Sequence, residues 1–165
     1  MSLSRNILIV CVLLTLSGCG FRPLYGPARS TDFAAIEIMP IKDRIGQQLY
    51  NDLLVRLNPH GQNPQPRYAL TVKLSESKNE LAVRKTAFAT RANLEVTADF
   101  TLFDYQSGKN VSAGKSAISV SFNILASEYG TSVAIKDART NAVRELAEDI
   151  RIRLGVYLDG LQGQG

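Results

Sequence analysis

Three segments of this chain alternate strictly between apolar and polar residues, and this pattern leaves few folds open to it. The apolar positions are Tyr68, Leu70, Val72 and Leu74; Leu94, Val96, Ala98, Phe100 and Leu102; and Ile118, Val120 and Phe122. A period of two places successive side chains on opposite faces of a β-strand. The pattern therefore predicts three strands, each with one face in the core. Gly108, in the connection 104–109, suits a hairpin turn, so the strands are expected to form an antiparallel meander.

Two other segments have the period of an amphipathic helix. In residues 44–57 an apolar residue recurs every four positions, and Asn58-Pro59 ends the pattern. A longer helix is predicted from Ser132 to Leu158, with one apolar stripe made of Val143, Leu146, Ala147, Ile150, Leu154, Tyr157 and Leu158. Residues 33–41 predict a first strand. Residues 58–66 hold three prolines and His60, and predict a loop.

Together these elements predict an α+β fold of two layers. The first strand, first helix and second strand form a right-handed crossover, which places the two strands parallel. The result is a mixed four-stranded sheet in the order β-α-β-β-β-α, with both helices packed on one face. The length of the chain suits a single domain. We expect this domain to span residues 31–160, followed by a flexible tail, 161–165.

The N-terminus has the three parts of a secretory signal peptide. Arg5 precedes an apolar run over residues 7–16, and Ser17-Gly18 supply the small residues of a cleavage site. A transmembrane helix would need about 20 apolar residues to cross a bilayer, and this run is too short. Residues 1–18 are therefore predicted to be a signal peptide.

The end of this leader resembles the lipobox of bacterial lipoproteins. Leu16-Ser17-Gly18-Cys19 ends the apolar run, and Cys19 is the only cysteine of the predicted mature chain. The resemblance implies lipidation of Cys19, with residues 19–30 as a tether. In lipoprotein families an aspartate after the cysteine signals retention in the inner membrane. Gly20 stands there in this chain, which implies a lipid-anchored protein on the periplasmic side of the outer membrane.

Composition excludes several kinds of chemistry. His60 is the only histidine, and no cysteine follows residue 19, so a zinc site or a Cys-His nucleophile pair lacks its ligands and its base. No Gly-rich phosphate loop is present. The net charge of +4 is too small to argue for nucleic acid. We therefore expect a binding protein with no catalysis, cofactor or metal, although the residues alone do not identify its partner.

The polar face of the predicted sheet carries mostly short uncharged side chains. Its residues are Thr71, Lys73 and Ser75; Asn93, Glu95, Thr97, Asp99 and Thr101; and Ser119, Ser121 and Asn123. One interpretation is an ordinary solvated face of an antiparallel sheet. The other is a surface that contacts the polar inner wall of a water-filled barrel, because hydroxyl and amide groups both donate and accept hydrogen bonds. The candidate barrel contacts are Thr97, Asp99, Ser119 and Ser121.

The mature N-terminus, Cys19-Gly20-Phe21-Arg22-Pro23-Leu24-Tyr25-Gly26, resembles that of the lipopolysaccharide-assembly lipoprotein family LptE. Further likeness lies in Gln47-Gln48-Leu49-Tyr50 and in residues 142–150. The resemblance implies two helices on a four-stranded sheet, a position as a plug inside the lipopolysaccharide translocon barrel LptD, and contact with lipopolysaccharide. This chain lacks the long polar C-terminal extension of some members. The best alternative is an accessory lipoprotein of another outer-membrane machine, for barrel assembly or as a secretin pilot.

Four basic residues are candidates for contact with the phosphates of lipopolysaccharide: Arg84, Lys85, Arg91 and Lys136. Arg and Lys bind phosphates by charge-assisted hydrogen bonds. The first three flank the connection between the second and third strands. Lys136 lies in the first turns of the long helix, where it resembles a basic position of the family. Ordinary surface charge that discourages pairing between sheet edges explains the same residues.

Overall fold

The computed structural model describes residues 33–59, 61–80 and 91–162. The predicted signal peptide 1–18, the tether 19–30 and Cys19 lie outside these residues. So do His60 and the segment 81–90, which contains Arg84 and Lys85.

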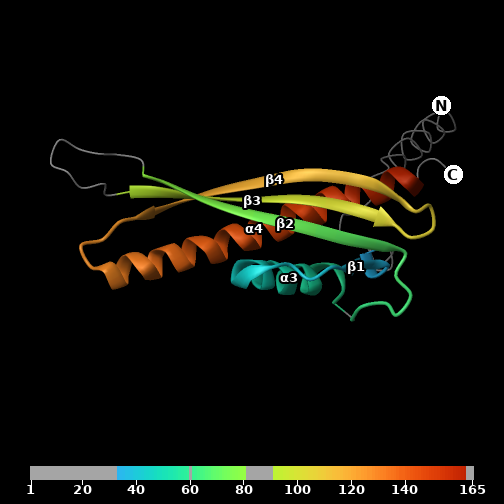
Figure 1. Ribbon diagram of the computed structural model, residues 1–165, viewed down its shortest axis with the longest axis horizontal. Coiled ribbons are helices and arrows are strands. Elements are labelled where there is room, and N and C mark those ends of the chain that lie inside the picture. The colour runs from blue at the N-terminus through green and yellow to red at the C-terminus, as the bar shows by residue number, and fades with distance from the viewer. Residues whose placement is uncertain (1–32, 60, 81–90, 163–165) are drawn as a thin grey trace, which may run out of the picture.

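Within the described residues six elements follow one another in the predicted order, and the predicted α+β fold is confirmed. They are β1 (Ile36–Ile38), α3 (Asp43–Leu57), β2 (Tyr68–Glu80), β3 (Arg91–Asp104), β4 (Lys109–Asn123) and α4 (Glu128–Gln162). The strands lie side by side in the order β1-β2-β3-β4. β1 is parallel to β2, while β2 with β3 and β3 with β4 are antiparallel. Both helices lie on the same side of the sheet and run along it (Figure 1).

The core lies between the sheet and the helices, where the alternation of the strands meets the stripes of the helices. Leu94, Val96 and Leu102 of β3 are almost fully buried, as are Leu146 and Ile150 of α4. Burial of a large aliphatic side chain contributes about 1.5–3 kcal/mol. Burial of these periodically spaced apolar side chains is therefore the main interaction that holds the sheet and the helices together.

β1 is much shorter than the predicted strand 33–41. It pairs with β2 only from Ile36 to Ile38. The Met39 N–H still donates to the Leu70 carbonyl at 2.9 Å, and Pro40 follows. Because proline has no N–H to donate, the ladder cannot continue past it. The prediction of a nine-residue strand was wrong, since apolar residues flanking a short strand also enter the core.

α4 extends beyond the predicted helix 132–158 at both ends. Its start is held by side-chain bonds: the Gly130 N–H donates to Ser127 Oγ at 3.3 Å, and the Leu125 N–H donates to Thr131 Oγ1 at 3.0 Å. The Ser127 hydroxyl thus satisfies an N–H group that the first helical turn leaves unpaired, and Thr131 joins the preceding loop to the helix. The first turns lie beyond the core, so their sequence lacks the apolar period. The helix also continues to Gln162, two residues into the expected tail.

α3 ends at Leu57, as predicted, and Asn58 joins its end to the sheet. The Asn58 N–H donates to the Leu54 carbonyl, and Asn58 Nδ2 donates to the Ile36 carbonyl at 2.9 Å. Asn58 is buried, so this bond fixes the end of α3 beside β1.

In the part of the chain that the structure describes, no helix is both long enough and apolar enough to span a membrane.

Candidate functional site

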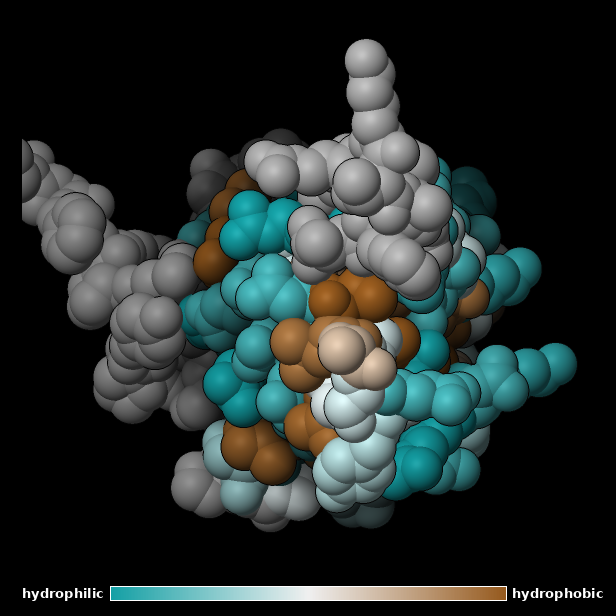
Figure 2. Space-filling view, turned by 90° about the vertical axis from the view of Figure 1, so that its left-hand side faces the viewer, coloured by the Kyte–Doolittle hydropathy of each residue, from teal (hydrophilic) through white to brown (hydrophobic). Residues whose placement is uncertain are grey.

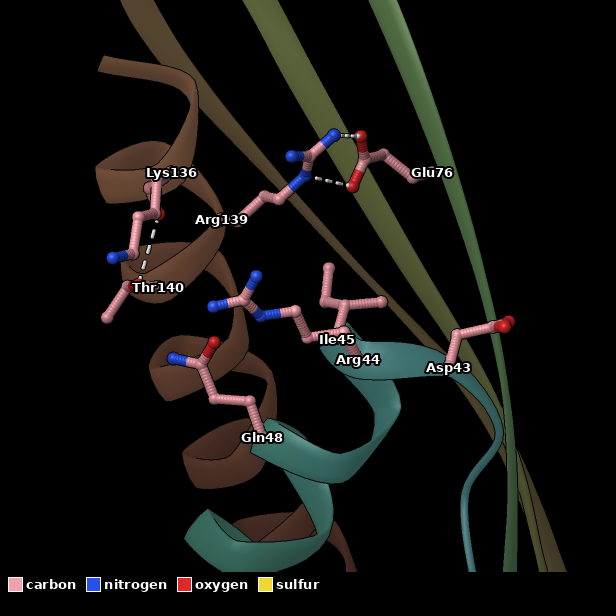
Figure 3. Close-up of a pocket in the computed structure, with 8 residues that line it drawn as sticks. All are labelled: Asp43, Arg44, Ile45, Gln48, Glu76, Lys136, Arg139 and Thr140. Atoms are coloured by element: carbon pink, nitrogen blue, oxygen red, sulfur yellow. Dashed lines mark hydrogen bonds and ion pairs between the residues drawn. The ribbon is translucent and has the colours of Figure 1, made fainter. Parts of the chain in front are cut away.

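A notch of about 450 Å³ opens between the start of α3, the N-terminal part of α4 and β2. Its lining combines three cationic and two acidic side chains with three others: Arg44, Lys136, Arg139, Asp43, Glu76, Ile45, Gln48 and Thr140. Figure 3 shows that Glu76 comes from β2, Arg44 and Gln48 from the first turns of α3, and Lys136 and Arg139 from α4. The notch exists because α3 is shorter than α4 and leaves part of the sheet uncovered.

One ion pair crosses the back of the notch. Arg139 Nε donates to Glu76 Oε2 at 2.8 Å, and Arg139 Nη2 donates to Glu76 Oε1 at 2.6 Å. The hydrogen bond with Glu76 is the main cause that raises the pKa of Arg139 above its usual value, although burial acts against it. A bidentate pair of this kind holds both side chains in one geometry. The pair joins α4 to β2 beside the first turn of α3.

Two cations of the notch are left for a ligand. Arg44 and Lys136 are both exposed, and neither forms an ion pair within the described residues. A guanidinium and an ammonium that share one recess can bind a phosphate or carboxylate from two sides. No group of three His, Cys, Asp or Glu side chains that could hold a metal ion occurs in residues 33–59, 61–80 and 91–162. The two unpaired cations of the notch favour an anionic ligand.

Apolar side chains are exposed at the end of the molecule where α4 begins. We call Leu125, Tyr129 and Val133 the apolar tip; they are 50%, 81% and 41% exposed. Figure 2 views this end and shows hydrophobic residues gathered at its centre. Tyr129, Val133 and Lys136 follow one another at helical spacing, so one face of α4 leads from the apolar tip to the notch. Two helical turns separate Tyr129 from Lys136, which is about 10 Å along the axis.

The structure describes two of the four basic residues predicted from the sequence, Arg91 and Lys136. Lys136 lines the notch on the helix side. Arg91 begins β3 opposite Asn123, and its odd position in the alternation places it on the side of the sheet away from the helices. Arg84 and Lys85 lie outside the described residues. The sequence assigned Arg91 and Lys136 to two separate places, and in the structure the sheet lies between them.

The predicted barrel contacts do share the face opposite the helices. Asp99, Ser119 and Ser121 are exposed there, and Ser121 Oγ donates to Asn93 Oδ1 at 2.6 Å. Thr97 is only 8% exposed. Thr97 lies in β3, an inner strand of the sheet. It pairs with Ser75 of β2 on one side and Ala117 of β4 on the other, and the residues of these strands cover it. Thr97 therefore offers little surface to a partner.

Sequence reasoning missed Arg44, Arg139 and Glu76. A signal was present in the alternation of β2, because Glu76 occupies a core-facing position after Tyr68, Leu70, Val72 and Leu74. An acid at such a position needs a cationic partner or solvent. It marks the place where the helix layer stops covering the sheet.

Comparison with known proteins identifies relatives along most of the chain. The model of the LptE family, described as lipopolysaccharide-assembly, matches residues 33–154. An uncharacterized protein of Rickettsia prowazekii is 28% identical over 153 residues, which cover 92% of this chain and 94% of the relative.

Solved structures share the fold. A crystal structure from Caulobacter crescentus, of a candidate lipoprotein, has a TM-score of 0.64 at 27% identity and covers 81% of this chain and 97% of its own. The rare lipoprotein B of Shewanella oneidensis has a TM-score of 0.62 at 13% identity, with 77% and 98% covered. At that identity the second likeness concerns the fold alone.

Proposed function

The chain belongs to the LptE lipopolysaccharide-assembly family, and from this membership we propose that it is an outer-membrane lipoprotein that binds and plugs the translocon barrel LptD. It assists the assembly of lipopolysaccharide at the cell surface and catalyses no reaction. Residues 1–18 are its signal peptide, Cys19 carries the lipid, and residues 19–30 tether the domain to the periplasmic side of the outer membrane. The family match over residues 33–154 is the observation that carries this proposal.

The far face of the sheet supports the contact with a barrel. Its exposed residues include Asp99, Ser119 and Ser121, and from Ala117 to Ser121 the side chains that β4 places on this face are small. Small polar side chains can approach a polar wall closely and bond to it in many geometries. The two described helices, α3 and α4, lie on the other side of the sheet, so they leave this face uncovered (Figure 1).

The notch and the apolar tip support the contact with lipopolysaccharide. Lipid A combines phosphates with acyl chains, and the two features offer cations and apolar surface on one face of α4. Arg44 and Lys136 bind a phosphate, while Arg139 stays paired with Glu76. Arg91 lies on the other face of the sheet, so we expect it to contribute less than Arg44 and Lys136.

Reversing both unpaired cations of the notch is expected to weaken lipopolysaccharide binding. A hydrogen bond to a charged group contributes about 1.5–3 kcal/mol, so Arg44→Glu with Lys136→Glu should weaken binding by at least about tenfold. Binding of purified lipopolysaccharide to the detergent-solubilised full chain measures the effect.

Two control variants make this result specific. Lys109→Glu with Arg144→Glu changes the net charge equally but lies outside the notch, and it should bind as the parent does. Arg91→Glu alone should have a smaller effect than the notch variant. Equal loss in all variants would mean that overall charge, and not the notch, attracts the ligand. A parent that binds no lipopolysaccharide would favour an accessory role in another outer-membrane machine.

A further inference from the structure

The outer edge of β4 is a free strand edge. β4 is the last strand of the sheet and spans Lys109–Asn123, and no described strand pairs with its outer side. The backbone groups along such an edge remain able to pair with another strand.

The C-terminal half of this edge lacks the features that usually prevent pairing. Residues 116–123, Ser-Ala-Ile-Ser-Val-Ser-Phe-Asn, contain no charge, no proline and no glycine. The one register shift between β3 and β4 lies at Leu102/Phe103, near the other end of the strand. Charged residues, prolines and bulges are the common protections of edge strands, and an uncharged segment with high β-propensity is the common site of association. We therefore expect a strand to cover this edge when the protein is free.

The phase of the hydrogen bonds identifies the backbone groups that face outward. The Met39 N–H donates to the Leu70 carbonyl, so even-numbered residues of β2 face β1 and odd-numbered residues face β3. The register carries this alternation across β3 to β4, where the even-numbered residues Ser116, Ile118 and Val120 face β3. The N–H and C=O groups of Ala117, Ser119 and Ser121 therefore point to the free edge.

The helix side of this edge is incompletely covered. Ile118 and Val120 are only half-buried although their side chains point toward the helix layer. A groove of about 320 Å³ lies between the end of β4 and α4, and Val120, Phe122 and Ala134 contribute to its apolar lining. A strand added to the edge would place its own apolar side chains over this groove.

We propose that a second copy of this chain covers the edge, with the two β4 strands antiparallel about Ser119. In this register Ser119 meets Ser119 of the second copy, Ala117 meets its Ser121, and Ile118 meets its Val120. Apolar side chains lie beside apolar ones toward the helices, small side chains lie beside small ones on the far face, and no like charges meet between residues 116 and 122. The contact is two-fold symmetric and therefore closed.

A barrel does not fit this edge in the same way. The strands of a closed barrel are already paired on both sides, so a barrel wall offers no free strand. The paired form is thus a state of the protein before it enters the proposed barrel complex, and it keeps the edge from random association. This proposal does not depend on the identity of the barrel.

Oxidation of a cysteine on the symmetry axis tests the register. Cα atoms of a hydrogen-bonded antiparallel pair lie about 5.5 Å apart, which is within the range of a disulfide. The full chain with Ser119→Cys, in mild detergent and treated with oxidant, should form a covalent dimer that reductant dissolves. The parent, in which Cys11 leaves with the signal peptide and the Cys19 thiol carries the lipid, should stay monomeric under the same treatment, and so should the Ser77→Cys variant on β2.

Mass measurements on unmodified protein test the association independently. Sedimentation of the parent should show a dimer that dilution dissociates. Ser119→Lys places two ammonium groups opposite each other and should weaken the dimer at least about tenfold, since like charges directly opposite destabilise a strand pair. Ser77→Lys should leave it unchanged. A parent that is monomeric at all concentrations, or that forms an open series of larger species, would overturn the proposal.

Discussion

Cys19→Ala is expected to move the protein from the membrane fraction to the soluble fraction of the periplasm. Each buried methylene of an acyl chain contributes about 0.8 kcal/mol, and several chains together anchor a protein almost permanently. Without the thiol, the diacylglycerol has no attachment point. Labelling with palmitate, followed by separation of membrane and soluble fractions, measures both consequences. We expect label in the parent and none in the variant.

Cys11→Ala is the matched control for this experiment. Cys11 is the only other cysteine and lies within the predicted signal peptide. Its replacement should leave both the label and the membrane retention unchanged. A Cys19→Ala protein that still carried palmitate would show that lipid is attached elsewhere, and the predicted anchor would then be wrong.

Gly114→Val is expected to destabilise the domain more than most single substitutions. Gly114 lies opposite Phe100 in the β3–β4 register, and a Cβ added there would lie 2.5 Å from Phe100 Cζ. The ring is buried, so it cannot move away without disturbing the core. Overpacking of this kind costs about 3 kcal/mol, which corresponds to a decrease of about 10 °C in the midpoint of thermal unfolding. Circular dichroism during heating measures it.

Two further variants separate the clash from a general effect of valine. Ala113→Val adds a branched side chain to the exposed neighbour on the other face of β4 and should change the midpoint little. Phe100→Leu should restore part of the stability of Gly114→Val, because it removes the ring atoms that the new side chain meets. If the double variant is no more stable than Gly114→Val, contact with Phe100 is not the cause.

The two layers of this fold could be predicted because the apolar residues recur every second position in the strands and about every 3.6 positions in the helices. Both sets of apolar side chains form one core. Every core-facing residue of β3 that the alternation identified, such as Val96 and Leu102, is buried. The ends of the elements followed less closely. β1 was overestimated because Phe33 and Ile41 are buried without belonging to the strand, and the start of α4 was missed because capping by Ser127 and Thr131 has no apolar period.

The candidate site was predicted less well than the fold. Lys136 was identified, but Arg44 was not. Arg44 lies near Lys136 because α3 begins beside α4 at this point of the sheet, and this depends on how the helices pack and not on the sequence of either helix. Arg91 was grouped with Lys136 by charge, although the alternation already placed Arg91 on the other face. Thr97 was chosen by type, and the neighbouring strands that bury it become evident only from the register.

Isolation of the protein from the outer membrane tests the central claim most directly. The full chain is tagged at its C-terminus, extracted with a mild detergent and purified, and the co-purifying barrel is identified by mass spectrometry. We expect the LptD barrel in an amount equal to that of the tagged protein. Recovery without any barrel, or with the barrel of another assembly machine in its place, would contradict the proposed function.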